Sequence, residues 1–286
     1  AAYSESSYMK GVGAAPEAFN SGPIMYDLLF DMAWEDKPVD CAQYVRDYIK
    51  SRYGGSNGHL EQAWDILLRT AYWKKETYAQ GAGESVINAR PSETFRSAST
   101  WGHSNFEYDQ KALEQALPEF IAAYDEYQDS ETFRYDMVDL AKQVLSNTAN
   151  RLHQQMMAAY YSKDLSLFEK LSGKFLDLIR LEDRILSFCP AFSLEKWIQS
   201  ARNALDGGSE QEKDLFEFNA RALITTWGDF QNSENCLLDY SNRQWSGLTQ
   251  SYYLKRWENF IQRYADSLKT GKEPAPFSYL PMEWAW

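Results

Sequence analysis

A single acidic side chain near the start of the chain has the setting of a catalytic carboxylate. Glu17 follows Gly11, Gly13 and Pro16, and helical spacing begins a few residues later, at Pro23. A turn rich in glycine and proline fixes the direction of the backbone, and such a turn is typical of the point where a barrel strand presents a catalytic side chain. Retaining glycoside hydrolysis needs two carboxyl groups about 5–5.5 Å apart, and Glu17 is the obvious candidate for one of them.

A second stretch, between Thr226 and Trp257, is rich in aromatic side chains. Aromatic faces bury the C–H groups of a pyranose ring, and a tyrosine hydroxyl can fix the orientation of the sugar. The stretch therefore suggests the wall of a sugar pocket. The residues alone leave alternatives open: 15% of the chain is aromatic, so these side chains can be core, and Glu17 can be an acid that stabilises a helix dipole.

Both stretches resemble segments of the α-N-acetylglucosaminidases of glycoside hydrolase family 89. Near the start of the chain, the resemblance is carried by residues 11–17, by residues 23–29 and by Trp34. It continues over nearly the whole chain, at residues 52–54, 63–69, 90–92, 133–136, 227–228, 238–240, 242–244, 252–253 and 256–257.

The resemblance implies roles for particular side chains. Glu17 matches the nucleophile of a retaining glycosidase that removes terminal, non-reducing α-linked N-acetylglucosamine from glycans through a glycosyl–enzyme intermediate. Trp227, Leu237 and Tyr240 match the positions at which the family's helical C-terminal domain contributes apolar and aromatic groups to the pocket. The family's acid/base glutamate would lie upstream of Ala1, so we expect this chain alone to be inactive or nearly so. The expected partners are the glycan and the upstream barrel domain of the same polypeptide.

The fold predicted from the sequence is mainly α. Residues 7–13 can form one short strand, a helix follows from Pro23, and helical periodicity joined by polar loops then continues without a fixed repeat. We therefore expect an irregular, non-repeating array of helices with a short N-terminal strand–helix remnant of a (β/α)8 barrel. With the resemblance, residues 1–37 are predicted to end the barrel domain and residues 38–286 to form an all-helical C-terminal domain.

Within the helical part, individual elements can be predicted. Apolar spacing predicts long helices over residues 131–162 and 165–187. Ser209 and Glu212 form a capping-box pattern, and Gly271 is expected to end the last long helix.

Proline and glycine predict where regular structure is interrupted. Pro118 must kink the helix that starts near Tyr108 or begin a new one. Residues 78–105 are predicted to be a long irregular loop of the kind that is often functional, and residues 272–286 an extended tail.

Composition excludes several other classes of protein. The net charge of −12 argues against nucleic-acid binding, which needs a basic face. No apolar window of about 20 residues predicts a membrane span, and no signal peptide is visible. From the glycan-degrading role, we expect an extracytoplasmic location in a bacterium, in the periplasm or at the cell surface.

Neither cysteine nor histidine spacing indicates a metal site, and we expect no cofactor. The cysteines are predicted to be buried free thiols. These residues are Cys41, Cys189 and Cys236, and the histidines are His59, His103 and His153. Two other functions stay open: a non-catalytic helical module that binds glycan or another protein domain, and an inactive relative within the same family.

Overall fold

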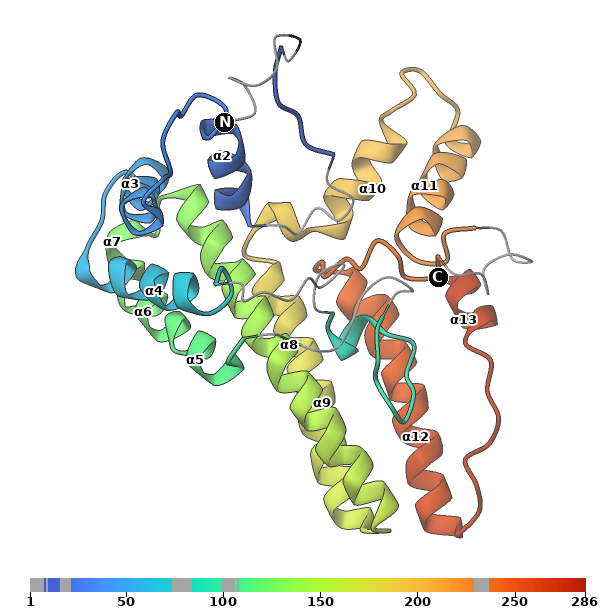
Figure 1. The fold of residues 1–286 in the computed structure, drawn as a ribbon. Coiled ribbons are helices and arrows are strands. Elements are labelled where there is room, and N and C mark those ends of the chain that lie inside the picture. Colours follow the sequence, from blue (N-terminus) through green and yellow to red (C-terminus); the bar gives the residue numbers. More distant parts are fainter. Residues whose placement is uncertain are drawn as a thin grey trace.

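The computed structural model describes residues 8, 10–15, 22–73, 84–98, 106, 108–228 and 237–286. These residues form an array of helices, drawn in Figure 1, and the mainly α prediction is confirmed. In this part of the chain the only strand-like pairing is an isolated parallel bridge between Ser193 and Ser246. Residues 8 and 10–15 form no strand. The rest of the predicted strand and Glu17 lie outside the described residues, so the barrel remnant stays a prediction.

A first group of helices packs against the N-terminal part of α8 (Glu131–Tyr161). Their shared core includes Ile49, Leu60, Phe120 and Phe133, all buried. The group consists of α2 (Pro23–Asp31), α3 (Cys41–Tyr53), α4 (Gly58–Arg69), α5 (Gln110–Glu114), α6 (Ala116–Ala122) and α7 (Tyr124–Tyr127). Pro118 lies in the first turn of α6, where its missing N–H costs no helical hydrogen bond. The break predicted at this proline is confirmed.

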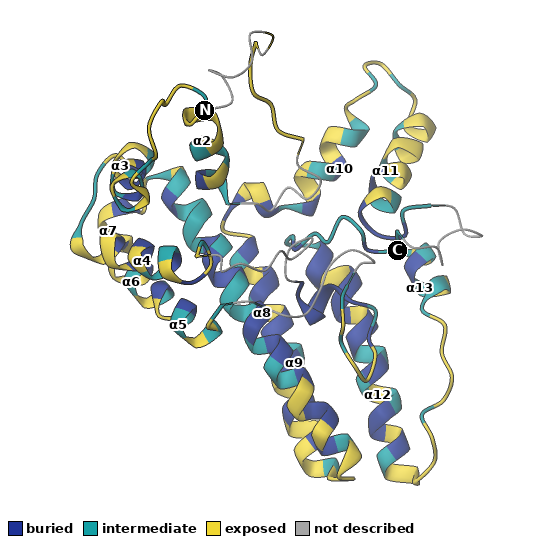
Figure 2. Ribbon diagram, in the orientation of Figure 1, coloured by how far each residue is buried: buried dark blue, intermediate teal, exposed yellow. Residues whose placement is uncertain are grey.

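Two long helices form the centre of the molecule. The predictions of α8 and of α9 (Leu165–Leu186) are confirmed, and the two helices run side by side as a hairpin (Figure 1). The long α12 (Leu254–Thr270) packs against α9. Phe175 and Trp257 meet in the core between them, with ring centroids 4.8 Å apart. Figure 2 shows buried residues gathered where these helices face one another.

A second hairpin is made by α10 (Leu194–Arg202) and α11 (Glu210–Ile224). The capping box predicted at the start of α11 is confirmed: the Ser209 side chain accepts a hydrogen bond from the Glu212 N–H, and the Glu212 side chain accepts one from the Ser209 N–H. Most of α11 is exposed, so little tertiary packing supports its first turns, where the cap satisfies backbone groups.

The C-terminal segment departs from the prediction. A π-helical turn over Thr249–Tyr253 precedes α12, and Gly271, at φ 68°, ends α12 as predicted. The tail was predicted to be extended throughout, which is wrong for its last residues. They form the short helix α13 (Leu280–Ala285), with Pro281 in its first turn. The loop predicted over residues 78–105 contains a short 3₁₀ turn, η1 (Val86–Asn88), that is buried.

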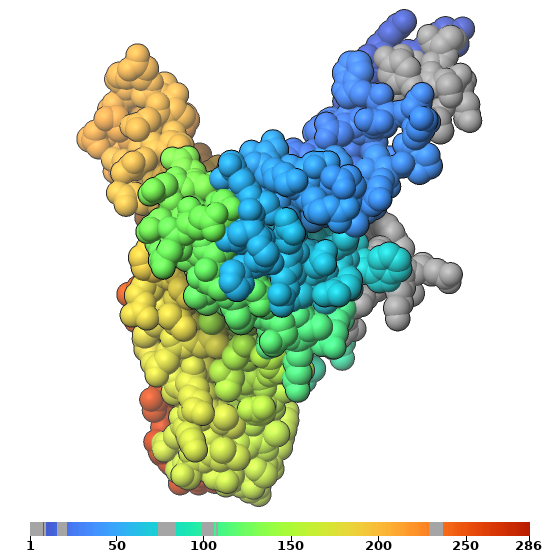
Figure 3. Space-filling model, turned by 90° about the vertical axis from the view of Figure 1, so that its left-hand side faces the viewer, coloured from blue at the N-terminus to red at the C-terminus, as the bar shows by residue number. Residues whose placement is uncertain are grey.

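One end of the molecule carries projecting elements. In Figure 3, the N-terminal region with α2 and the hairpin of α10 and α11 both extend from the same end of the body. Apolar side chains around α2 are exposed there, among them Met25, Met32 and Trp34, the last to 89%. None of the helices in the described ranges combines the length and apolar character that a bilayer span requires.

Candidate functional site

The end of α11 is a tight turn in an uncommon backbone conformation. Trp227 has φ 57°, in the left-handed region that bulky side chains rarely adopt. Its N–H donates to the Ala222 carbonyl over 2.7 Å, which ties the turn back onto the helix. Backbone strain of this kind persists only where the surroundings enforce it, and it often marks a functional site.

The segment 237–242 lies against this turn. The Asp239 N–H donates to the Thr225 carbonyl over 2.8 Å, and Asp239 and Asn242 have φ of 54° and 45°. As a result, the rings of Trp227 and Tyr240 meet edge to face, with centroids 5.3 Å apart. Both side chains are half-buried, so each keeps an accessible surface.

The structure therefore brings together Trp227 and Tyr240, two of the three residues that the sequence singled out for the pocket. Leu237, the third, is half-buried and lies in the same segment as Tyr240, whose N–H donates to the Leu237 carbonyl over 3.0 Å. An indole and a phenol next to one another can bury one face of a sugar and orient it. Glu17 lies outside the described residues, so its role as nucleophile stays a prediction.

A buried ion cluster lies behind this turn, and sequence reasoning missed it. Asp239 and Arg256 are both buried and are joined by two hydrogen bonds, of 2.9 and 3.2 Å. The Arg256 guanidinium also contacts Glu283 of α13 at 2.8 Å. Burial raises the pKa of the Asp239 carboxyl to about 6, and the neighbouring Arg256 opposes this rise. The available signal was an arginine within the apolar stripe of the last long helix, next to Trp257.

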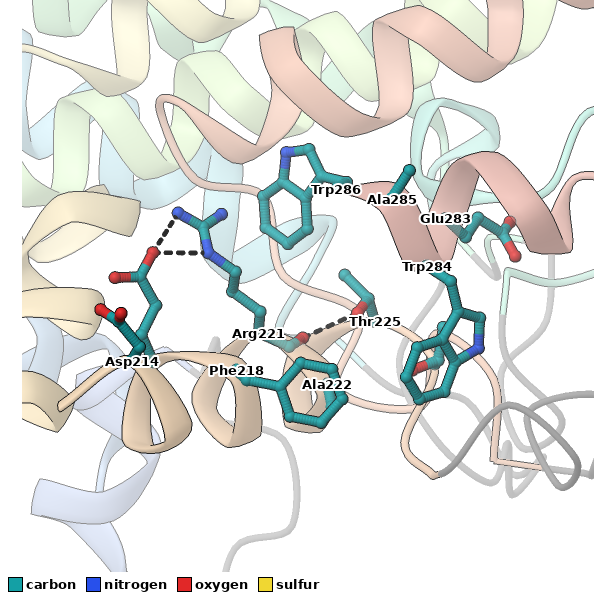
Figure 4. Close-up of a pocket in the computed structure, with 11 residues that line it drawn as sticks. Asp214, Phe218, Arg221, Ala222, Thr225, Glu283, Trp284, Ala285 and Trp286 are labelled. Atoms are coloured by element: carbon teal, nitrogen blue, oxygen red, sulfur yellow. Dashed lines mark hydrogen bonds and ion pairs between the residues drawn. The ribbon is translucent and has the colours of Figure 1, made fainter. Parts of the chain in front are cut away.

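A pocket of about 370 Å³ opens beside the turn, between α11 and α13. Figure 4 shows aromatic side chains around it, and the Phe218 and Trp284 rings lie 5.5 Å apart. Arg221 is held by Glu217 at 2.7 Å, and its guanidinium lies 4.5 Å from the centre of the Trp286 ring. The pocket also reaches Thr225 and Thr226, the residues immediately before Trp227.

Among the histidine and cysteine side chains in the described ranges, His153 and Cys189 are buried and serve packing, whereas His59 is exposed and contacts Glu119. His153 contacts the Ser92 carbonyl and the ring of Trp257, and burial lowers its pKa. Cys41 and Cys189 are free thiols; Cys189 is buried, but the expectation of burial is wrong for Cys41, which is exposed at the start of α3. No group of three His, Cys, Asp or Glu residues with metal-binding geometry occurs in these ranges. His103 and Cys236 lie outside them.

Comparison with known proteins gives consistent matches. The family model for the alpha-N-acetylglucosaminidase (NAGLU) C-terminal domain matches residues 44–286. Human alpha-N-acetylglucosaminidase is 31% identical over 267 residues, which are 93% of this chain and 34% of the human protein.

Solved structures of a family 89 glycoside hydrolase from Clostridium perfringens also match. In complex with PUGNAc, that enzyme superimposes on all of this chain with a TM-score of 0.95 and 46% identity. A variant with two glutamates replaced by glutamine, solved with its substrate GlcNAc-alpha-1,4-galactose, matches equally well. This chain covers 32% of the bacterial enzyme, so it spans about a third of the length of these relatives.

Proposed function

Because the chain belongs to the α-N-acetylglucosaminidase C-terminal domain family, we propose that it is the C-terminal part of a retaining α-N-acetylglucosaminidase. Its substrate would be a glycan that ends in a non-reducing, α-linked N-acetylglucosamine. The observation that carries this proposal is the ring contact between Trp227, in the strained turn at the end of α11, and Tyr240, in the segment that begins at Leu237. The complex of the bacterial relative with GlcNAc-alpha-1,4-galactose supports the class of substrate.

The proposed chemistry divides the work between two parts of one polypeptide. Glu17 attacks the anomeric carbon and forms a β-configured glycosyl–enzyme, and a second carboxyl group from the upstream barrel donates a proton to the leaving oxygen. Water then opens the intermediate and releases the α-sugar. Trp227 and Leu237 bury the apolar face of the sugar, and the Tyr240 hydroxyl orients it.

The exposed apolar surface around α2 supports the proposal that an upstream domain packs against this chain. Met25, Met32 and Trp34 are exposed at the end from which α10 and α11 also project (Figure 3). An accumulation of exposed apolar side chains typically marks a surface that another domain covers. We propose that the barrel domain covers this end, that residues 1–37 complete the barrel and that residues 38–286 form the helical domain. We also propose an extracytoplasmic location in a bacterium, which fractionation of the source cells would check.

Substitution of the proposed nucleophile tests this function. In the full-length enzyme, Glu17→Gln keeps the shape of the side chain but removes the nucleophilic oxygen. We expect kcat on an aryl α-N-acetylglucosaminide to fall by more than about a thousandfold, because members of a catalytic group act as a unit. The matched control is Glu273→Gln, an exposed acid in the C-terminal tail, which should retain the wild-type rate.

The outcome also separates the alternatives. Wild-type turnover by Glu17→Gln would end the assignment of the nucleophile. A full-length wild type that binds N-acetylglucosamine without turnover would favour a glycan-binding module or an inactive relative. The aromatic pocket of about 370 Å³ is consistent with a glycan-binding module.

A further inference from the structure

The side chain of Arg256 joins distant parts of the chain. It projects from α12 and is almost fully buried, at 1% exposure. Its two terminal nitrogens donate to both carboxylate oxygens of Asp239, over 2.9 and 3.2 Å. The Nη2 atom also donates to the Tyr252 hydroxyl over 2.6 Å, and the guanidinium lies 4.2 Å from the centre of that ring.

Glu283, from α13, completes the cluster. Its side chain is fully buried, and one carboxylate oxygen lies 2.8 Å from Nη2 of Arg256. The same oxygen accepts a hydrogen bond from Nε of Arg90 over 2.9 Å. Two guanidinium groups thus face two carboxylates, Asp239 and Glu283. A buried cluster whose charges balance is tolerated, whereas removal of one member leaves an uncompensated charge.

The cluster is formed where the C-terminal segment reaches the candidate sugar site. Arg90 and Glu283 are 193 positions apart in the sequence, so the contact depends on the tail folding back onto the loop at residues 84–98, which is buried over residues 84–89. In Figure 4, Glu283 lies on α13 with its carboxylate turned away from Arg221. The tail therefore presents aromatic side chains to the pocket and this carboxylate to the interior.

Asp239 connects the ion cluster to the candidate sugar site. Its backbone is in the left-handed conformation and bonds to the end of α11, and the next residue, Tyr240, contacts Trp227. A second tie holds the same turn, because the Asn88 side chain donates to the Asn242 side chain over 2.7 Å. A strained turn stays in place only as long as such ties hold it.

We propose that Glu283, acting through Arg256 and Asp239, is a positioning residue for the ring pair of Trp227 and Tyr240. The C-terminal segment is then part of the architecture of the sugar site. This inference rests on the proposed function. It differs from a general stabilising role because it predicts a specific loss of sugar binding in a protein that is still folded.

The test is Glu283→Gln in the full-length enzyme, a change that keeps the shape of the side chain and removes its charge. Arg90 and Arg256 then face one carboxylate, the Asp239 turn relaxes, and the ring pair moves. We expect KM for an aryl α-N-acetylglucosaminide to rise about tenfold, with kcat within about threefold of wild type. This pattern is expected when a variant loses an interaction that binds the ground state and the transition state equally. Glu273→Gln, an exposed acid in the same tail, is the control and should keep the wild-type KM.

A double-mutant cycle separates positioning from a purely structural role. If Glu283 acts through the ring pair, Glu283→Gln should raise KM much less in a Trp227→Ala background than in the wild type. If the two substitutions raise KM by independent factors that multiply in the double variant, the inference is overturned. An unchanged KM in folded Glu283→Gln would also overturn it. If that variant does not fold, Arg90→Lys at the partly exposed edge of the cluster replaces it and should raise KM about threefold, with an unchanged KM again overturning the inference.

The two proposals fail in different ways. A full-length wild type without turnover, or a Glu17→Gln variant that keeps turnover, would overturn the proposed function and with it this inference. An active wild type, an inactive Glu17→Gln variant and a wild-type KM for Glu283→Gln would overturn the positioning role alone.

Discussion

Among single residues, Glu182 of α9 has the environment with the clearest consequence for stability. Its side chain is fully buried, and Oε1 accepts a hydrogen bond from Nε2 of Gln244 over 2.8 Å. Its other oxygen has no hydrogen-bond partner among the described residues. Burial raises the pKa of the Glu182 carboxyl to about 8, although Gln244 and Lys142 oppose the rise. The folded protein therefore holds this group protonated at neutral pH.

Stability should accordingly decrease as the pH rises from about 4.5 to about 8. Unfolded Glu182 releases its proton near its ordinary pKa of 4.5, and folded Glu182 near 8. Between these values the folded state binds more protons, so the free energy of unfolding falls with rising pH, by up to about 1.4 kcal/mol per pH unit. Glu182→Gln should remove the part of this dependence that Glu182 contributes and so reduce the slope. Urea unfolding of both proteins between about pH 5 and about pH 8 measures it.

The exposed Glu273→Gln variant is the matched control for this measurement and should keep the wild-type slope. Identical slopes for wild type and Glu182→Gln would show that the carboxyl is ionised in the folded protein, with a charged partner or solvent compensating it.

At the scale of elements, local signals predicted helix ends well. Ser209 with Glu212, Pro23 and Gly271 act over a few residues, and the structure places a cap, a first turn and a left-handed end at these positions. Local signals did not predict α13, whose buried residue, Glu283, contacts Arg90, 193 positions away.

The candidate site was likewise predicted only in part, because some of its features depend on contacts between distant residues. The family pattern singled out Trp227 and Tyr240, but their ring contact depends on backbone at φ 57° and on the bond from Asp239 to Thr225. No spacing rule encodes either feature. The buried partners of Arg256 were missed for the same reason, since they come from loop 84–98, the turn at Asp239 and the tail.

The cap of α11 can be tested directly. In α11 the buried residues are Ala220 and Ile224, near its C-terminal end, so little packing holds its first turns. Ser209→Ala leaves the Glu212 N–H without its acceptor and should lower the free energy of unfolding by about 1 kcal/mol. Chemical denaturation measures the loss, and hydrogen exchange should show it in the first turns of α11.

Ser200→Ala provides the comparison for this cap. Ser200 is an exposed interior position of α10, where alanine has the higher helix propensity and stability should be unchanged or slightly raised. An equal loss in both variants would contradict a specific role of the capping box.

At the scale of the whole molecule, the described helices enclose buried cores, and apolar side chains are exposed at one end. One core lies among α3 to α8 and another among α8, α9 and α12, and each contains large, fully buried aromatic side chains such as Phe133 and Trp257. These cores are large enough for the chain to fold without the rest of a longer polypeptide. The proposed sugar site differs from these cores, because it would need groups from the upstream barrel.

The isolated chain of residues 1–286 should therefore fold but lack catalytic activity. We expect it to be helical by circular dichroism and to unfold cooperatively, yet to hydrolyse an aryl α-N-acetylglucosaminide at less than about a thousandth of the full-length rate, since its proton donor would belong to the barrel. Full-length enzyme at equal molar concentration is the reference. Substantial turnover by the isolated chain, lost again on Glu17→Gln, would show that one of its own 41 acidic residues donates the proton.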